Sequence, residues 1–280
     1  MAARGAAPTS GGLLTRIVVG VALAAVAIAA VWAGGVAFTA LVTTACLLMS
    51  AEWSVMHGIA RGFRLASLVV LAFVAGVTVY VSAADALIVL AASAGAIALF
   101  MRGFDRSRAF WVAAGLLYCG LPMVALLWLR GRVGGGGIVA VCFAIVWATD
   151  IGAFFIGRTL GGPKFAPRIS PNKTWAGVIG GIVAALLAGF IVVSLVQFPL
   201  PGWSAWRLAN NALGVALWTV PFALIAIAGD LFESWLKRRA GVKDSGHLLP
   251  GHGGVLDRVD GLAPVAVAVA LVWALGGSWQ

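Results

Sequence analysis

The sequence has 280 residues, of which 62% are hydrophobic and only 10% are charged, and its formal net charge is +10. Soluble globular domains average about 25% charged residues, so the composition excludes that class and indicates a chain that crosses a membrane several times. The positive-inside rule explains the excess of basic residues, and no nucleic-acid partner is expected.

Apolar stretches recur along the chain at about the 20-residue length that a helix needs to cross a bilayer. They predict an all-α polytopic membrane protein with about nine transmembrane helices. The predicted spans are residues 17–33, 36–51, 65–82, 84–101, 109–129, 138–157, 174–198, 212–236 and 255–274. The first two are short and joined by Gly34 and Gly35, which suits a shallow hairpin.

The distribution of basic residues predicts the orientation. With the N-terminus inside, these spans place 16 of the 19 lysines and arginines on the cytoplasmic side, leaving Arg130, Arg132 and Arg207 outside. The predicted location is therefore the cytoplasmic (inner) membrane, with the C-terminus outside. Residues 1–130 hold five spans and residues 131–280 hold the other four with the chemically active loops, in one integrated membrane domain.

Two small-residue features have structural explanations. The cysteines lie singly in apolar segments, so we interpret them as core residues without disulfide or zinc partners: Cys46, Cys119 and Cys142. Along the span 174–198, small residues recur every four positions: Gly177, Gly181, Ala185 and Gly189. Such a stripe suits close helix contact, either within one subunit or between the subunits of a homodimer.

Residues 229–260 are the most polar stretch and hold five of the nine acidic residues. The first half predicts a helix end, because polar residues at i, i+3, i+4 and i+7 share one helical face: Asp230, Glu233, Ser234 and Lys237. Glycine and proline then predict an irregular loop. Carboxylates and cations gathered between apolar helices suit a divalent metal that holds a polyphosphate, although a solvated loop that sets topology is the simpler alternative.

The last span needs residues from about Val255 onward to reach across the membrane. Asp257 and Asp260 are then predicted in its first turns, where the helix dipole favours carboxylates. Gly229, beside Asp230, removes bulk where another backbone or an ion could approach.

A second polar loop, residues 157–174, joins two spans on the same side. Ser170 and Pro171 predict an N-cap and a first helical position, with Lys173 on the first turn. Such a helix end binds phosphate readily, although a capped helix with basic topology markers would look the same. Asp150 lies about 10 Å inside the preceding span, at a depth similar to Asp230, which predicts one shared polar cavity or, alternatively, a structural hydrogen bond.

The fixed positions of the first polar stretch carry a resemblance. They are Ser234, Leu236, Lys237, Arg238, Lys243, Asp244, Gly246, Leu249, Pro250, His252, Gly253, Gly254, Asp257, Arg258 and Asp260. At these spacings the stretch resembles the signature of the phosphatidate cytidylyltransferase (CDP-diacylglycerol synthase) family, and the Ser-Pro-x-Lys-Thr stretch at 170–174 is also similar to that family's. The resemblance implies a nucleotidyltransferase of phospholipid biosynthesis that uses CTP and phosphatidic acid and releases pyrophosphate.

The resemblance and the charge pattern together assign roles. The expected cofactor is Mg²⁺, with or without a second cation, and its ligands are drawn from Asp230, Asp257 and Asp150. The other catalytic candidates are Lys237, Arg238, Lys243 and Asp260. The residues expected to contact substrate are Lys173, Arg158, Ser234, His252, Gly253, Gly254 and Arg258.

Two other functions remain as alternatives. A CTP-dependent lipid kinase would transfer the γ-phosphoryl group to an alcohol and release CDP. A cation-coupled transporter would place ionisable groups near the bilayer midplane on broken, repeated helices, whereas these acidic residues gather near one face.

Overall fold

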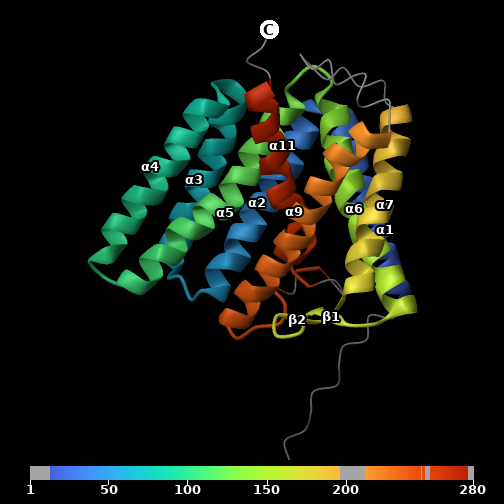
Figure 1. Cartoon of the computed structure of the whole chain (residues 1–280). Coiled ribbons are helices and arrows are strands. Elements are labelled where there is room, and N and C mark those ends of the chain that lie inside the picture. Colours follow the sequence, from blue (N-terminus) through green and yellow to red (C-terminus); the bar gives the residue numbers. More distant parts are fainter. Residues whose placement is uncertain (1–12, 196–211, 247, 250–252, 277–280) are drawn as a thin grey trace, which may run out of the picture.

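The computed structural model describes residues 13–195, 212–246, 248–249 and 253–276. Within these ranges the chain forms a bundle of long helices with one small two-stranded sheet at one end (Figure 1). The N-terminal helices are α1 (Leu13–Ala33), α2 (Gly35–Met56), α3 (Arg61–Tyr80), α4 (Ala83–Arg102) and α5 (Arg106–Arg130). The remaining elements are α6 (Gly135–Leu160), β1 (Lys164–Ala166), β2 (Ser170–Thr174), α7 (Trp175–Leu195), α9 (Ala212–Arg239), α10 (Leu256–Val259) and α11 (Leu262–Gly276).

The all-α polytopic prediction is confirmed at this level. Among the described residues, seven helices are long and apolar enough to cross a membrane: α2 to α7 and α9. Two shorter apolar helices, Ile17–Ala33 within α1 and Leu262–Gly276, lie in the regions of the first and last predicted spans, so the count of nine stays a prediction. The second span is longer than predicted, because α2 has 22 residues, and α1 and α2 meet at Gly34, whose φ of 63° breaks the helix.

Helix α5 occupies the centre of the bundle, where it packs against α2, α3, α4, α6 and α11. Its inward side chains are fully buried, Leu129 among them. The three cysteines are free and buried in the same hydrophobic core, as predicted: Cys46, Cys119 and Cys142.

Helices α6 and α7 approach each other unusually closely, because glycine removes the side chains between them. A Cβ at Gly181 would lie 2.8 Å from the carbonyl oxygen of Thr149, and one at Gly177 would lie 2.9 Å from that of Ala153. Two members of the predicted small-residue stripe, Gly177 and Gly181, therefore pack against α6, while Gly189 packs against Thr219 of α9, all within one subunit.

The segment before α7 differs from the prediction. Ser170 to Thr174 form strand β2, paired antiparallel with β1, so Ser170 does not cap a helix and Lys173 does not lie on a first helical turn. The helix begins at Trp175, and the Thr174 hydroxyl caps it by accepting a hydrogen bond from the Gly177 N–H at 3.1 Å. Pairing with β1 satisfies backbone groups that the predicted helical turn would have used.

The last predicted span is also divided. Helix α10 begins at Leu256, close to the predicted start, but the chain turns at Asp260 and Gly261 before α11 begins. Pro264 has no N–H to donate to the carbonyl of Asp260, which explains the interruption. Gly229 of α9 packs against this carbonyl and against the ring of Pro264, so the predicted role of Gly229 in a close approach is confirmed.

Candidate active site

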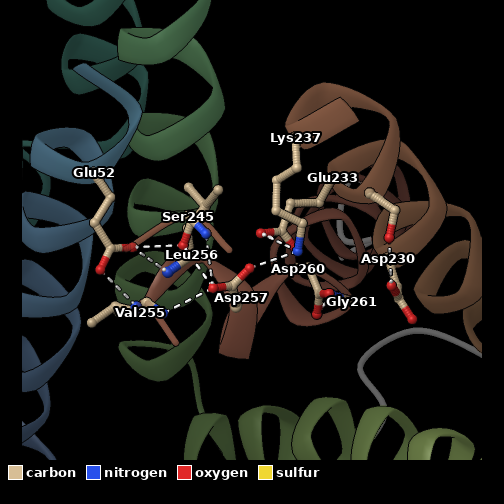
Figure 2. A network of polar contacts seen from close by, with 12 residues as sticks. Glu52, Asp230, Glu233, Lys237, Ser245, Val255, Leu256, Asp257, Asp260 and Gly261 are labelled. Carbon is tan, nitrogen blue, oxygen red and sulfur yellow. Dashed lines mark hydrogen bonds and ion pairs between the residues drawn. The ribbon is translucent and has the colours of Figure 1, made fainter. Parts of the chain in front are cut away.

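Figure 2 shows Asp257 and Asp260 beside the C-terminal half of α9, which carries Asp230, Glu233 and Lys237. The predicted helical face is present, because α9 continues to Arg239. On that face the Ser234 hydroxyl donates to Asp230 over 3.4 Å, and the Lys237 ammonium lies 3.4 Å from Glu233. Glu233 is completely buried.

Asp257 is the most heavily bonded of the predicted residues. Its Oδ1 accepts from Lys237 Nζ at 2.6 Å, and its Oδ2 accepts from the backbone N–H groups of Gly254 at 2.8 Å and Ser245 at 3.0 Å. Burial opposes ionisation of this carboxyl, but the lysine and the two amides outweigh it and hold the pKa of Asp257 below its usual range. The side chain is 6% exposed, so a fixed carboxylate stands between α9 and the loop before α10.

Glu52, which was not among the predicted site residues, lies on α2 about two hundred residues earlier in the chain. Its carboxylate accepts the N–H groups of Val255 and Leu256, both at 2.9 Å, and lies 3.0 Å from the Ser245 hydroxyl. The Ser245 hydroxyl also lies 3.0 Å from Asp257 and can donate its single proton to either carboxylate (Figure 2). Glu52 therefore fixes the loop whose backbone N–H groups bind Asp257. A buried acid in an otherwise apolar helix was the one available signal.

Glycines give this loop its shape. Gly253 has φ +80°, a conformation that side-chain-bearing residues rarely adopt, and a Cβ there would lie 2.6 Å from an Asp257 oxygen. At Gly246 a Cβ would lie 2.7 Å from the Glu52 carboxylate. Gly253 and Gly254 are predicted to contact substrate together with His252, which lies outside the described residues, so this role stays a prediction.

The β-hairpin brings a second lysine to the cluster. Lys173, on β2, forms an ion pair with Asp230 of α9. Asp150 is near enough to Asp260, Asp230, Lys173 and Arg258 for their charges to act on it. The helices of the sixth, eighth and ninth predicted spans, α6, α9 and α11, pack against one another, whereas one cavity shared by Asp150 and Asp230 stays a prediction.

Two further carboxyl groups face each other within this cluster. Glu233 and Asp260 are electrostatic neighbours, and the Gly261 N–H donates to Asp260 at 2.8 Å. Burial, together with the nearby charge of Asp230, raises the pKa of Asp260. Buried carboxylates this close repel each other unless a proton or a cation lies between them. The arrangement thus favours bound positive charge.

The other predicted basic residues lie around the rim. Arg238, Lys243 and Arg258 are exposed to solvent at this end of the chain. Arg158 is exposed near the end of α6, and its guanidinium lies 5.8 Å from the ring centre of Phe154. A rim of this kind is accessible to an anionic ligand that approaches from water.

The donor chemistry fits Mg²⁺ only if the substrate completes the coordination. Within the described ranges, no three side chains of histidine, cysteine, aspartate or glutamate converge into a ready-made metal site. Asp230 and Asp257 present hard carboxylate oxygens, each now paired with a lysine. Mg²⁺ commonly binds through one or two carboxylates plus substrate phosphates and water, so two aspartates suffice when a phosphate ligand is present.

Comparison with known proteins agrees with this geometry. Residues 14–275 match the model of the Cytidylyltransferase family. The chain is 41% identical over 269 residues to the phosphatidate cytidylyltransferase of Brucella suis biovar 1 (strain 1330), with 94% of each chain covered. It is 48% identical over 120 residues to the protein of that name from Haemophilus influenzae (strain ATCC 51907 / DSM 11121 / KW20 / Rd), which covers 43% of this chain and 40% of the relative. With an acidic and basic cluster at one end of a membrane bundle and a match over nearly its whole length, the chain belongs to the cytidylyltransferase family.

Proposed function

We propose that this protein is a phosphatidate cytidylyltransferase, which transfers the CMP moiety of CTP to phosphatidic acid. In this reaction a phosphate oxygen of phosphatidic acid attacks the α-phosphorus of CTP, the bond from that phosphorus to the bridging oxygen breaks, and pyrophosphate leaves. The products are CDP-diacylglycerol and pyrophosphate. The observation that carries the proposal is the Asp230–Lys173 and Asp257–Lys237 pairing at one end of an apolar bundle, in a chain that is similar over 94% of its length to a protein of this name.

The charges of the site suit this chemistry. The attacking lipid phosphate is already anionic, so the step needs no strong base; it needs alignment of the two substrates and compensation of their mutual repulsion. Lys173 and Lys237 lie where they can supply positive charge to phosphate oxygens, and both are partly buried, with side-chain exposures of 23% and 14%. Arg258 and Lys243 on the rim would contact the outer phosphates of CTP.

The proposed cofactor is Mg²⁺. Asp230 and Asp257 would hold the ion, with Asp150 and Asp260 as further acidic groups of the same cluster. When bound, the ion supplies charge neutralisation at the phosphate oxygens. Lys173 and Lys237 would then turn from the aspartates to the substrate phosphates. Glu52 keeps the Asp257 loop in place for this exchange.

A lipid substrate also requires access from the bilayer. A cavity of about 430 Å³ lies between α5, α9 and α11, and it is lined by apolar side chains such as Leu121, Phe232 and Leu271. Gly229, which also lines it, precedes Asp230 in the chain. This cavity would receive the acyl chains of phosphatidic acid while its phosphate reaches the acidic cluster.

The proposed topology has nine spans, a cytoplasmic N-terminus and an active site that faces the cytoplasm of the inner membrane. The order of the helices supports it, because α2, α4, α6 and α9 all end in the direction of the basic residues. A homodimer is not required, since the small-residue stripe of α7 packs against helices of its own subunit.

The test is transfer of label by the detergent-purified protein with phosphatidic acid and Mg²⁺. CTP labelled at the α-phosphorus should deliver label to the lipid phase together with release of pyrophosphate, and CTP labelled at the γ-phosphorus should not. In a parallel reaction with diacylglycerol as the alcohol acceptor, transfer of label from the γ-phosphorus to the lipid would identify a CTP-dependent lipid kinase. If well-folded protein forms neither labelled lipid, nucleotide and phosphoryl transfer are both rejected and the transporter alternative is favoured.

A further inference from the structure

A second cavity, of about 770 Å³, lies at the opposite end of the bundle from the acidic cluster, between α1, the α5–α6 turn and the N-terminal half of α6 (Figure 1). Its walls are mostly apolar and include the aromatic side chains Trp32, Phe143 and Trp147. Two arginines, Arg130 and Arg132, line the same cavity. The cavity is large enough for a headgroup and part of an acyl chain, and far larger than a single inorganic anion needs.

Arg130 is fixed in the cavity wall. Its Nε donates to the carbonyl oxygen of Val31 at 3.0 Å, which ties α5 to the end of α1. Gly34 leaves space for the guanidinium, because a Cβ at that position would overlap its terminal nitrogen. A guanidinium has five N–H donors, and this contact uses one of them. Among the described residues its other donors have no hydrogen-bond partner, so they could bind an acceptor in the cavity.

Arg132 is exposed, and its guanidinium lies 4.7 Å from the ring centre of Trp128. Across the residues that the structure describes, neither Arg130 nor Arg132 has an acidic ion-pair partner. The acidic residue at this end, Asp85, starts α4, a helix that packs against α3 and α5 rather than against α1 or α6. The cavity therefore carries two positive charges without a compensating carboxylate.

The positive-inside rule does not explain why Arg130 and Arg132 lie at this end of the bundle. Together with Arg207, Arg130 and Arg132 are the basic residues that the predicted topology leaves outside, so they run against the charge distribution of most of the chain. Arg130 is only partly exposed, and holding its guanidinium beside an apolar wall without a carboxylate is unfavourable unless an anion accompanies it, while the exposed Arg132 adds a second positive charge to the cavity lining. The ligand that combines an anion with apolar length in this setting is a lipid.

We propose that this cavity binds an anionic glycerophospholipid, with the phosphate held by Arg130 and Arg132 and an acyl chain lying along α1 and α6 against Trp32 and Trp147. The site is separate from the candidate active site, because Gly135 and Asp150 are 15 positions apart on α6, or about 22 Å along its axis. The inference therefore holds whether or not the proposed function is correct.

The experiment is native mass spectrometry of the full chain, purified in detergent, stripped of lipid and titrated with phosphatidylglycerol or phosphatidylcholine. Wild-type protein should retain one phosphatidylglycerol at concentrations where phosphatidylcholine does not bind. Arg132→Gln should weaken this binding about fivefold, since one basic residue contributes about 1 kcal/mol to attraction of an anionic lipid. Arg132 is preferred to Arg130 because it does not carry the bond to α1.

A second variant and two controls make the result specific. Ala140 lines the cavity, so Ala140→Phe should fill it and reduce binding without changing the charge. Arg61→Gln removes an exposed charge from the other end and should leave binding unchanged, as should Lys173→Ala in the candidate active site. Equal binding of the two lipids, or unaltered phosphatidylglycerol binding by both Arg132→Gln and Ala140→Phe, would overturn the proposal. Loss of binding in Lys173→Ala alone would place the lipid in the active site instead.

Discussion

Replacing Glu52 by glutamine should inactivate the enzyme from a position that contacts no predicted catalytic side chain. The glutamine keeps the shape of the side chain and one acceptor oxygen. Its NH₂ group, however, would face N–H and O–H donors that bond to a carboxylate oxygen in the wild-type protein. Those donors are the Val255 and Leu256 N–H groups and the Ser245 hydroxyl, at 2.9, 2.9 and 3.0 Å. At a residue only 5% exposed, water cannot replace the missing acceptor.

The magnitude follows from these contacts. A hydrogen bond to a charged acceptor contributes about 1.5–3 kcal/mol, and a buried donor left unsatisfied costs about 1–3 kcal/mol. Allowing for relaxation, Glu52→Gln should weaken the attachment of the loop before α10 by about 2–4 kcal/mol, which corresponds to about 30- to 900-fold in its opening equilibrium. Because Asp257 accepts from the same loop at Gly254 and Ser245, kcat should fall much more than the affinity for CTP changes.

The assay combines steady-state kinetics with hydrogen exchange of the peptide that covers residues 245–257. Faster exchange in this peptide, with unchanged exchange in the core of α5, is the expected result for Glu52→Gln. The matched control is Ser54→Ala on the same helix, because in the described part of the chain the buried Ser54 hydroxyl bonds to no group other than the Ser50 carbonyl of α2. Wild-type kcat and wild-type exchange in Glu52→Gln would refute the reasoning.

Three other substitutions test the site and the frame around it. Asp257→Ala should abolish turnover while membrane insertion stays normal, since α11 keeps its apolar length; near-normal turnover of well-inserted protein at saturating Mg²⁺ would reject its role. Lys173→Ala should reduce kcat/KM for CTP or phosphatidic acid by about tenfold or more, and unchanged kinetics for both substrates would leave Lys173 a topology marker. Asp105 caps α5, and bonds from the Arg108 and Ser107 N–H groups and the Ser107 hydroxyl lower its pKa. The ionised Asp105 carboxylate should therefore stabilise the fold at pH values above the pKa that this group has in the unfolded chain, and this stabilisation should disappear as the pH falls through its lower pKa in the folded protein. The Tm difference between wild type and Asp105→Ala should shrink in acid, and a pH-independent difference would contradict this.

The helical part of the site could be predicted because it depends on local periodicity. The spacing of Asp230, Glu233 and Lys237 alone puts them on one face of a helix, and the apolar length of each span predicts its helix. The depth of Asp150 relative to Asp230 also follows from counting residues along two helices that end at the same level. The helices that carry these two residues, α6 and α9, pack against each other.

The contacts missing from the prediction are those that join distant segments. Glu52 stands in an apolar helix without a motif, and only the folded bundle shows that it receives the backbone of residues 255 and 256. The sequence around Ser170 and Pro171 satisfies the local rules for a helix start, but pairing with β1 overrides them. Local preference decides a helix end only where no neighbouring strand competes for the same backbone groups.

The close approach of α6 and α7 has a mechanical consequence. These two helices touch backbone to backbone at Gly152, Gly177 and Gly181, so they cannot slide past each other, and we expect them to move with the hairpin between them as one rigid unit. Asp150 and Lys173 both belong to this unit, whereas Asp230 belongs to α9. If the site widens to admit two large substrates, the ion pair between Lys173 and Asp230 should break, while the distance between Lys173 and Asp150 should stay constant.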